Sequence, residues 1–206
     1  MSGTSYQDSA YEAEVAPHKR ALFARLGAFP PSCTVVEIGV GGFGNAALYP
    51  PGTLVTGVEP DLRKHASALA HARTHNVRLQ ILAGVAEALP MPDCSVDAVV
   101  MTCTLCSVAC PHTALREVLR VLKPGGMLLF WEHILSESDA GVARLQRAAT
   151  PRELLGWGCR FDRRSLEAVE SAGFGRLHGI AADGACYLEL PGLGLMGPTA
   201  AGIGVK

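Results

Sequence analysis

Two acidic residues lie near the ends of two short apolar segments, 22 positions apart. Glu37 belongs to TVVEIGV and precedes Gly39 and Gly41, where the backbone has no Cβ and can approach a ligand closely. Glu59 closes the segment LVTGVEP. A carboxylate before such glycines repels a pyrophosphate but attracts a cationic or amino-bearing group. A second carboxylate at this distance can accept hydrogen bonds from both hydroxyls of a ribose, so the pair predicts a site for a positively charged nucleoside.

S-adenosylmethionine (AdoMet) fits this description, because its ammonium and its sulfonium are both positive. Phe43 stands where the dinucleotide-binding pattern has its third glycine, and Gly44 follows one place late. The glycine spacing and the acid at position 37 both disagree with an NAD-dependent dehydrogenase. We expect AdoMet to bind this loop, with Phe43 either turned outward over the methionine part or packed under the following helix. Glu59 has the alternative role of capping the helix that starts near Pro60.

Cysteines and a histidine gather in the segment 103–112, which reads CTLCSVACPH. Thiolates with a nearby histidine are ligands for zinc or for an iron–sulfur cluster. The segment has one C-x-x-C pair and no second pair at a matching distance, so we expect no metal site. Three interpretations stay open: Cys103 and Cys106 as small buried residues that face the cofactor, arsenic or another thiophile bound as substrate, or a structural metal.

The elements that position these residues follow an alternation of apolar and helical patterns. Strands are expected at 34–40, 54–60, 77–84, 95–103, 127–133, 175–182 and 199–206, and helices at 12–27, 61–75, 112–122, 142–156 and 163–172. The first five strands are apolar on both faces, and helices bridge them. This alternation predicts a parallel sheet covered on both sides, with the ligand crevice at the carboxyl ends of its strands.

Composition sets further limits. The 206 residues, 49% hydrophobic and 18% charged, suffice for one domain with a full core. A net charge of −1 and the absence of any Lys/Arg-rich run argue against a nucleic-acid partner. The first twenty residues lack the apolar stretch of a signal peptide or membrane anchor. Seven cysteines, an odd number, argue against a disulfide framework, so we expect a cytoplasmic protein with reduced thiols.

Several motifs resemble those of the class I AdoMet-dependent methyltransferases. GVAEALPMPDCSVD at 84–97 and LREVLRVLKPGG at 115–126 follow the glycine loop in the order found in that family. Val85 departs from the pattern, because many relatives have an aspartate there that meets the adenine amino group. The resemblance therefore implies that backbone amides near Ala86 and Glu87 recognise the base.

The chain is more closely similar to the methyltransferase-like 7 family, the alkyl thiol S-methyltransferases, almost from end to end. The matching segments are HKRALF, LYPPGTLVTGVEP, TLCSV, WEH, Gly158-Cys159 and Val205-Lys206. That family places an N-terminal hydrophobic helix on endoplasmic reticulum or lipid droplet membranes. No such helix occurs in this sequence, so we expect no integral membrane segment.

The expected fold is α/β, a Rossmann-like, doubly wound, mostly parallel seven-stranded sheet with an antiparallel C-terminal edge hairpin. We expect one class I methyltransferase domain, 1–206. In it, 1–30 form a helical lid segment, 34–133 the AdoMet-binding core, and 136–206 the substrate-side helices and last two strands. The expected cofactor-binding residues are Glu37, Gly39, Val40, Gly41, Glu59, Pro60, Ala86, Glu87, Thr102, Cys103 and Leu105.

Methyl transfer from a sulfonium is an in-line displacement, so no catalytic acid is obligatory. A thiol acceptor has a pKa near 8.5, and a useful fraction is ionised at neutral pH. His133 is the one candidate for a catalytic group, with a hydrogen bond to a loop carbonyl as its alternative role. Our leading hypothesis is methylation of a small-molecule acceptor, with a thiol favoured by the resemblance. Methylation of oxygen, nitrogen or arsenic, or a non-catalytic AdoMet-binding domain, are the alternatives, and no obligatory protein partner is expected.

Overall fold

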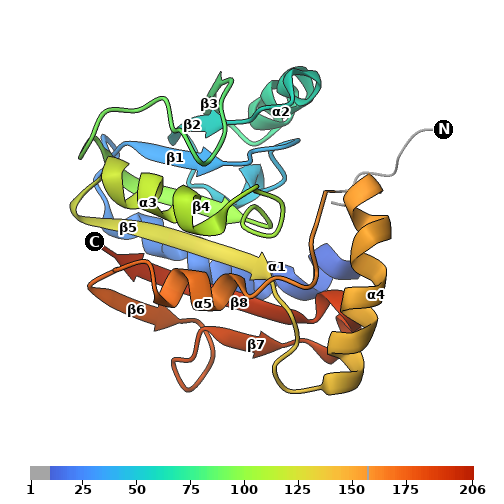
Figure 1. Ribbon diagram of the computed structural model, residues 1–206. Helices are drawn as coiled ribbons and strands as arrows, with labels where there is room; N and C mark the ends of the chain where they lie inside the picture. The colour runs from blue at the N-terminus through green and yellow to red at the C-terminus, as the bar shows by residue number, and fades with distance from the viewer. Residues whose placement is uncertain (1–9, 157) are drawn as a thin grey trace.

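Continuous apolar segments form the strands of one mixed sheet in this computed structural model, which describes residues 10–156 and 158–206. Residues 1–9 of the expected lid segment and Trp157 lie outside the described residues. The strands are β1 (Val35–Ile38), β2 (Leu54–Val58), β3 (Arg78–Leu82), β4 (Val96–Thr102), β5 (Leu122–His133), β6 (Arg176–Gly179), β7 (Tyr187–Glu189) and β8 (Pro198–Val205). They follow the order β3-β2-β1-β4-β5-β8-β6, with β7 paired to β8 (Figure 1).

The expected fold class is confirmed. The outer edge of the sheet, beside β8, consists of two short strands. β1 to β5 pair in parallel, whereas β8 runs antiparallel to β5. β6 pairs with the last residues of β8, from Gly202 to Val205, and β7 pairs with its first residues, from Pro198 to Ala200. The eight strands therefore occupy seven positions, because β6 and β7 share the edge and the segment 180–186 interrupts it.

The helices lie close to their expected positions, with one difference near the N-terminus. They are α1 (Ala10–Phe23), α2 (Leu62–Thr74), α3 (Pro111–Val121), α4 (Ala140–Gly156) and α5 (Ser165–Glu170), with the short 3-10 turns η2 (Ala24–Ala28), η3 (Ala46–Leu48) and η4 (Pro191–Met196). The expected helix 12–27 continues beyond Phe23 only as a 3-10 turn. Asp61 caps α2 by accepting a hydrogen bond from the Arg63 amide at 3.1 Å, as its side chain predicted.

Successive residues of the central strands enter two different cores. Val35 packs into a core that also contains Leu22 and Phe23 of α1, whereas Val36 packs into a core with Leu115 of α3 and Leu166 of α5. Figure 1 shows the corresponding layers, with α3 and α5 in front of the sheet and α1 behind it. This two-sided burial is the reason why the strand sequences are apolar without alternation.

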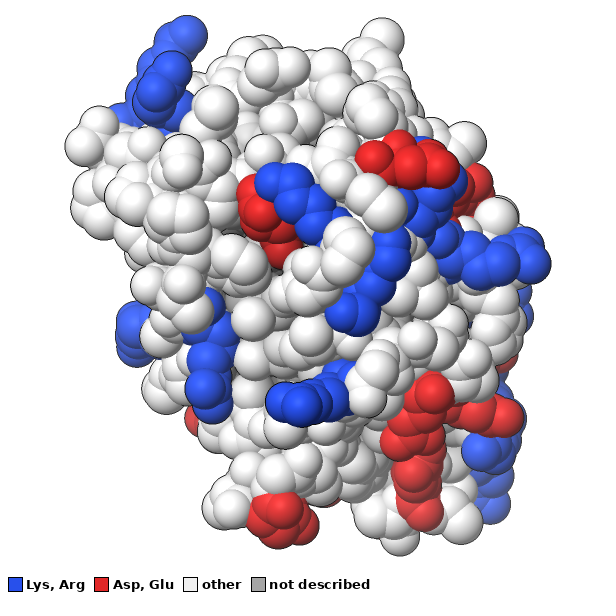
Figure 2. All heavy atoms as spheres, turned by 90° about the vertical axis from the view of Figure 1, so that its left-hand side faces the viewer, with Lys and Arg blue, Asp and Glu red and all other residues white. Residues whose placement is uncertain are grey.

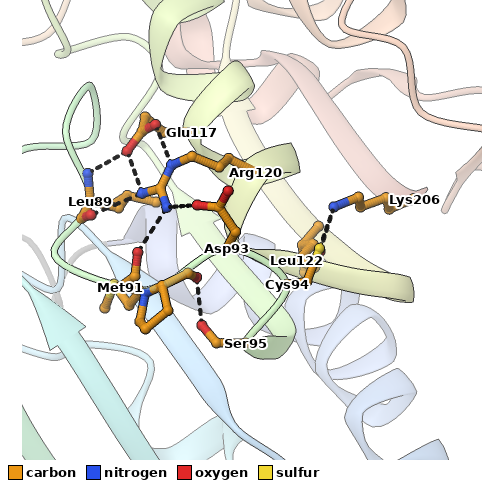
Figure 3. A network of polar contacts seen from close by, with 10 residues as sticks. Leu89, Met91, Asp93, Cys94, Ser95, Glu117, Arg120, Leu122 and Lys206 are labelled. Atoms are coloured by element: carbon orange, nitrogen blue, oxygen red, sulfur yellow. Dashed lines mark hydrogen bonds and ion pairs between the residues drawn. The ribbon is translucent and has the colours of Figure 1, made fainter.

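The loop after β3 is held against α3 by one arginine (Figure 3). The Arg120 guanidinium donates to the carbonyl oxygens of Leu89 and Met91 at 3.0 and 2.8 Å, and to the Asp93 carboxylate at 2.7 Å. Glu117 binds the same guanidinium and also accepts a hydrogen bond from the Leu89 amide at 2.8 Å. Arg120 therefore has four backbone or carboxylate partners. Together they hold the loop that contains the residues predicted to recognise adenine.

The surface view shows the molecule from the side of the amino ends of the parallel strands (Figure 2). Basic and acidic side chains are interspersed on this face, and neither sign forms a continuous stripe there. Within the described part of the chain, no helix combines the length and the apolar character needed to cross a membrane.

Candidate functional site

A cavity of about 550 Å³ opens at the carboxyl ends of the parallel strands. It lies where the chain order changes direction, between β1 and β4, which is the usual ligand position in a doubly wound sheet. Its lining residues are Glu12, Lys19, Glu37, Gly39, Val40, Gly41, Gly42, Gly44, Asn45, Lys64, Thr102, Cys103, Cys106, Ser107, His133, Cys159, Phe161, Leu193, Leu195 and Met196. The structure thus brings together seven predicted residues, namely Glu37, Gly39, Val40, Gly41, Thr102, Cys103 and His133.

Glu37 forms the buried floor of one end of this cavity. Its side chain is 2% exposed and accepts hydrogen bonds from the Tyr49 hydroxyl at 2.5 Å and from the Asn45 amide at 2.9 Å. Burial raises the pKa of the Glu37 carboxyl to about 7, although these two hydrogen bonds and the nearby Lys19 charge lower it. The carboxyl is therefore close to half-ionised at neutral pH, and a cation that enters the cavity favours its charged form.

The glycines of the first loop allow the chain to turn sharply beside the cavity. Gly39 has a φ of +72°, and a Cβ there would lie 2.6 Å from the Thr104 hydroxyl oxygen. That hydroxyl donates a hydrogen bond to the Ile38 carbonyl at 2.9 Å. Gly41 has a φ of +53°, and its nearest neighbour for an added Cβ is the Gly39 carbonyl oxygen at 3.8 Å. A side chain at position 39 would thus collide with Thr104, whereas the space beside Gly41 is open.

Phe43 takes the second of the two orientations that the sequence left open. Its side chain is fully buried and stacks on Tyr49, with ring centroids 5.6 Å apart. Tyr49 in turn meets Phe23 of α1 edge to face. Phe43 therefore supports the loop from beneath and is not among the residues that line the cavity.

Four of the other predicted cofactor residues are not among the residues that line the cavity. Glu59 is buried, and its carboxylate accepts hydrogen bonds from the amides of Gly41 at 2.8 Å and Asp61 at 3.0 Å. Ala86 and Leu105 are buried in the core beside α3. Pro60 is exposed. A carboxylate has lone pairs beyond these two bonds, so Glu59 keeps acceptor capacity for a ribose.

Glu87 also lies outside the cavity lining, in the loop between β3 and β4, and contacts the residues just before α3. Its carboxylate accepts hydrogen bonds from the amides of Ala109 at 2.7 Å and Cys110 at 3.1 Å. The segments 84–95 and 103–110 are joined by this contact, so both loops that flank the expected adenine position hold one relative arrangement.

Sulfur and nitrogen atoms gather at the other end of the cavity. Cys106, His133 and Cys159 are all buried, and one ligand atom from each lies within 4.8 Å of the other two. His133 Nδ1 is 3.7 Å from the Cys159 sulfur, and His133 Nε2 is 2.9 Å from the Tyr11 hydroxyl. Cys103, whose φ is +53°, places its sulfur 3.9 Å from Nε2 on the opposite side of the ring. The candidate His133 therefore contacts thiols and a phenol.

Glu132 organises the loop that carries these cysteines. Its two carboxylate oxygens accept hydrogen bonds from the amides of Thr104 at 3.0 Å and Cys106 at 3.3 Å. Burial raises the pKa of the Glu132 carboxyl to about 7, against the lowering effect of these amides. The side chain is fully buried and directed to the backbone, so it acts on the loop and not on a ligand.

Sequence reasoning did not assign several lining residues. Cys159, Phe161 and Met196 come from segments after α4 and within η4, far along the chain from the glycine loop. In the sequence, Gly158-Cys159 is only one of the segments that carry the family resemblance. Lys19 lies on α1, is 5% exposed and pairs with Glu12 at 3.2 Å. Both residues belong to the segment 1–30, for which the sequence predicts a lid.

Residues 36–130 of the chain match the family model described as a methyltransferase domain. The chain is 37% identical over 164 residues to thiol S-methyltransferase TMT1B of Rattus norvegicus, which covers 76% of this chain and 67% of that protein. It is 37% identical over 175 residues to thiol S-methyltransferase TMT1A of Homo sapiens, which covers 81% of this chain and 71% of that protein.

Solved structures of methyltransferases share the fold. A SAM-dependent methyltransferase from Thermotoga maritima superposes with a TM-score of 0.60 at 24% identity, over 95% of this chain and 94% of that chain. Geranyl diphosphate C-methyltransferase from Streptomyces coelicolor A3(2), solved with S-adenosyl-L-homocysteine, gives a TM-score of 0.62 at 16% identity, over 92% of this chain and 78% of that chain. At these identities the likeness concerns the architecture.

Proposed function

This chain belongs to the family of the thiol S-methyltransferases, and we propose that it transfers the methyl group of AdoMet to the sulfur of a small thiol. It is an AdoMet-dependent methyltransferase, as the sequence resemblance predicted. The observation that supports a thiol is the shape and chemistry of the cavity. One end has the Gly39–Gly41 turn and Glu37, and the other has cysteine sulfurs with the apolar side chains of Phe161 and Met196.

The residues at the glycine end fit AdoMet. Glu37 offers a carboxylate whose ionised form a positive ammonium would stabilise, and Gly41 leaves space that a side chain would fill. When bound, AdoMet supplies an activated methyl group on a sulfonium. We propose that Glu37 holds the methionine ammonium and that Glu59 accepts from the ribose hydroxyls. The buried segment at Ala86, with the Arg120 network behind it, supports the expected place for adenine.

The chain promotes transfer by orientation and by exclusion of water. Phe161, Leu193 and Met196 offer an apolar surface to an acceptor at the cysteine end of the cavity. An acceptor sulfur held there faces the methyl group along the direction of displacement, which removes the entropic cost of alignment. A desolvated thiolate is also a stronger nucleophile than a hydrated one.

The pH dependence of AdoMet binding follows from Glu37. Burial raises the pKa of this carboxyl to about 7, so the ionised fraction increases as pH rises through neutrality. If the ammonium binds the carboxylate, affinity for AdoMet should increase about fivefold between pH 6 and pH 7, in proportion to that fraction. The charged or titratable groups that face Glu37 are Tyr49 from the end of η3 and Lys19 from α1. Calorimetric titration at both pH values measures the change.

Glu37→Gln is the matched variant for this measurement, because it keeps the shape and the acceptor for the Tyr49 hydroxyl. It should bind AdoMet more weakly at pH 7 and show no increase between pH 6 and pH 7. An increase of the same size in Glu37→Gln would assign the titration to another group.

A panel of acceptors with methyl-labelled AdoMet tests the proposed reaction. Small alkyl thiols should yield labelled thioethers, whereas matched phenols, amines and arsenite should yield little labelled product. Labelling of phenols, amines or arsenite without any thiol would contradict S-methylation. AdoMet binding without transfer to any acceptor would instead support a non-catalytic AdoMet-binding domain.

The segment 1–30 acts as a lid, with Glu12 and Lys19 at the cavity wall as support, while 34–133 bind the cofactor and 136–206 complete the acceptor end. The partner is a small-molecule acceptor, without an obligatory protein partner. A cytoplasmic location is supported by the cysteines, all free and spread through the described residues.

A further inference from the structure

We propose that Cys106, His133 and Cys159 form a zinc site whose open fourth position takes the sulfur of the acceptor. The inference rests on the proposed thiol methylation and identifies how the thiol is held. Two thiolates and an imidazole are the ligand types that zinc prefers, and three protein ligands with one open position are typical of catalytic zinc. The sequence argued against a metal because it has one C-x-x-C pair and no second pair at a matching distance. The third ligand proposed here, Cys159, lies 53 positions after Cys106.

The spacing of the ligand atoms suits a tetrahedral ion. Zinc–sulfur bonds of about 2.3 Å and zinc–nitrogen bonds of about 2.0 Å place a sulfur and a nitrogen ligand roughly 3.5 Å apart at tetrahedral angles. The Cys159 sulfur and His133 Nδ1 are 3.7 Å apart, and all three ligand atoms lie within 4.8 Å of one another. The three atoms are therefore spaced within about 1 Å of the separations that a tetrahedral zinc ion requires.

Fixed elements present the three ligands. His133 is the last residue of β5, in the middle of the sheet. The Arg160 amide donates to the Cys106 carbonyl at 3.0 Å, which ties the two cysteine-bearing loops together. The Glu132 carboxylate accepts a hydrogen bond from the Cys106 amide. Such a site needs little ordering when the ion binds.

The surroundings also suit a metal ligand. A histidine that binds metal through one ring nitrogen usually donates a hydrogen bond from the other. His133 Nε2 lies 2.9 Å from the Tyr11 hydroxyl oxygen, which can accept that proton while Nδ1 faces the Cys159 sulfur at 3.7 Å. Two thiolates neutralise a divalent ion, so the group carries no net charge in its buried position.

The open position faces the cavity, because all three residues line it beside Phe161. An acceptor thiol that binds zinc gives its S–H proton to water and becomes a thiolate. Its sulfur lone pair then forms a bond to the methyl carbon while the bond between that carbon and the sulfonium sulfur breaks. The released electron pair stays on the departing sulfur, which yields S-adenosylhomocysteine and a neutral thioether. The thioether is a weaker ligand than the thiolate, so it leaves.

Cobalt substitution tests the site without turnover. The full chain should bind about one Co²⁺ and develop the visible and thiolate-to-cobalt absorption bands of a tetrahedral site. Cys106→Ser and Cys159→Ser should lose these bands, whereas Cys110→Ser, at an exposed cysteine outside the group, should keep them. Titration of each variant with AdoMet verifies its fold, and the wild-type spectrum decides the question if both variants fail to fold. The absence of tetrahedral bands in the wild type, or equal loss in Cys110→Ser, would overturn the proposal.

A second readout addresses the acceptor. Addition of propanethiol to the Co²⁺ protein should intensify the thiolate-to-cobalt band, and propanol should leave it unchanged. Removal of metal with a chelator should lower thiol methylation by roughly tenfold or more. An unchanged spectrum with propanethiol, or a fully active metal-free enzyme, would overturn the zinc site and leave thiol methylation standing. A spectrum that responds to propanethiol in a protein that methylates no thiol would instead overturn the proposed function and support the metal site.

Discussion

Replacement of Gly41 by valine is expected to weaken AdoMet binding at least about a hundredfold, a loss of roughly 2.7 kcal/mol. Gly41 lines the cavity, and an added Cβ would meet no protein atom closer than the Gly39 carbonyl oxygen at 3.8 Å. The valine side chain would therefore occupy space beside the cofactor. Its φ of +53° is also strained for a β-branched residue, which displaces the loop and the amide bound by Glu59.

The control for Gly41→Val is Gly52→Val. Gly52 also has a positive φ, +83°, and no atom lies within 4 Å of an added Cβ. It precedes β2, at the opposite end of the sheet from the cavity. Both variants should lose a similar stability, about 1–3 kcal/mol from backbone strain, but Gly52→Val should bind AdoMet normally. Calorimetric titration compares them, and equal binding by both would place the cofactor elsewhere.

Phe43→Gly should destabilise the protein by about 2–4 kcal/mol. Loss of a fully buried phenylalanine that stacks on Tyr49 costs about 3–5 kcal/mol, and relief of its positive φ of 61° returns about 1 kcal/mol. Because Phe43 does not line the cavity, the folded variant should bind AdoMet with less than about a tenfold change. Urea unfolding and AdoMet titration measure the two effects separately.

Asn76→Gly separates strain from packing in this comparison. Asn76 has a φ of +55° and is exposed, so glycine relieves the same kind of strain without removing a buried side chain. The unfolding free energy of the Asn76→Gly variant should stay within about 0.5 kcal/mol of that of the wild type or rise slightly. If Phe43→Gly proved as stable as Asn76→Gly, the phenyl ring would have no supporting role under the loop.

The sequence predicted the parts of the site that depend on local pattern. Glu37 lies near the end of one apolar strand and Gly39 and Gly41 follow it, and the strand order of a doubly wound sheet places them at the crevice. Thr102 ends β4 and Cys103 follows it, so the same rule places both at the crevice. The fold class was predictable because strands buried on both faces read as continuous apolar runs.

The other half of the cavity depends on contacts that no local pattern encodes. Cys159 meets His133 only because the segment after α4 returns to the sheet, where the Arg160 amide binds the Cys106 carbonyl. The orientation of Phe43 was equally hidden, since it depends on Tyr49 and Phe23, which approach from η3 and α1. The effect of Glu59 on the glycine loop was also hidden in the sequence, because it depends on a hydrogen bond from the Gly41 amide to the Glu59 carboxylate.

A crystal structure of the chain with S-adenosylhomocysteine would place the cofactor in this cavity or exclude it. We expect the ligand between the Gly39–Gly41 turn and the β4 loop, with its amino group beside Glu37 and its sulfur directed to Cys106, His133 and Cys159. A ligand bound outside this cavity, or one with its adenine at the cysteine end, would contradict the assignment of both the cofactor site and the acceptor site.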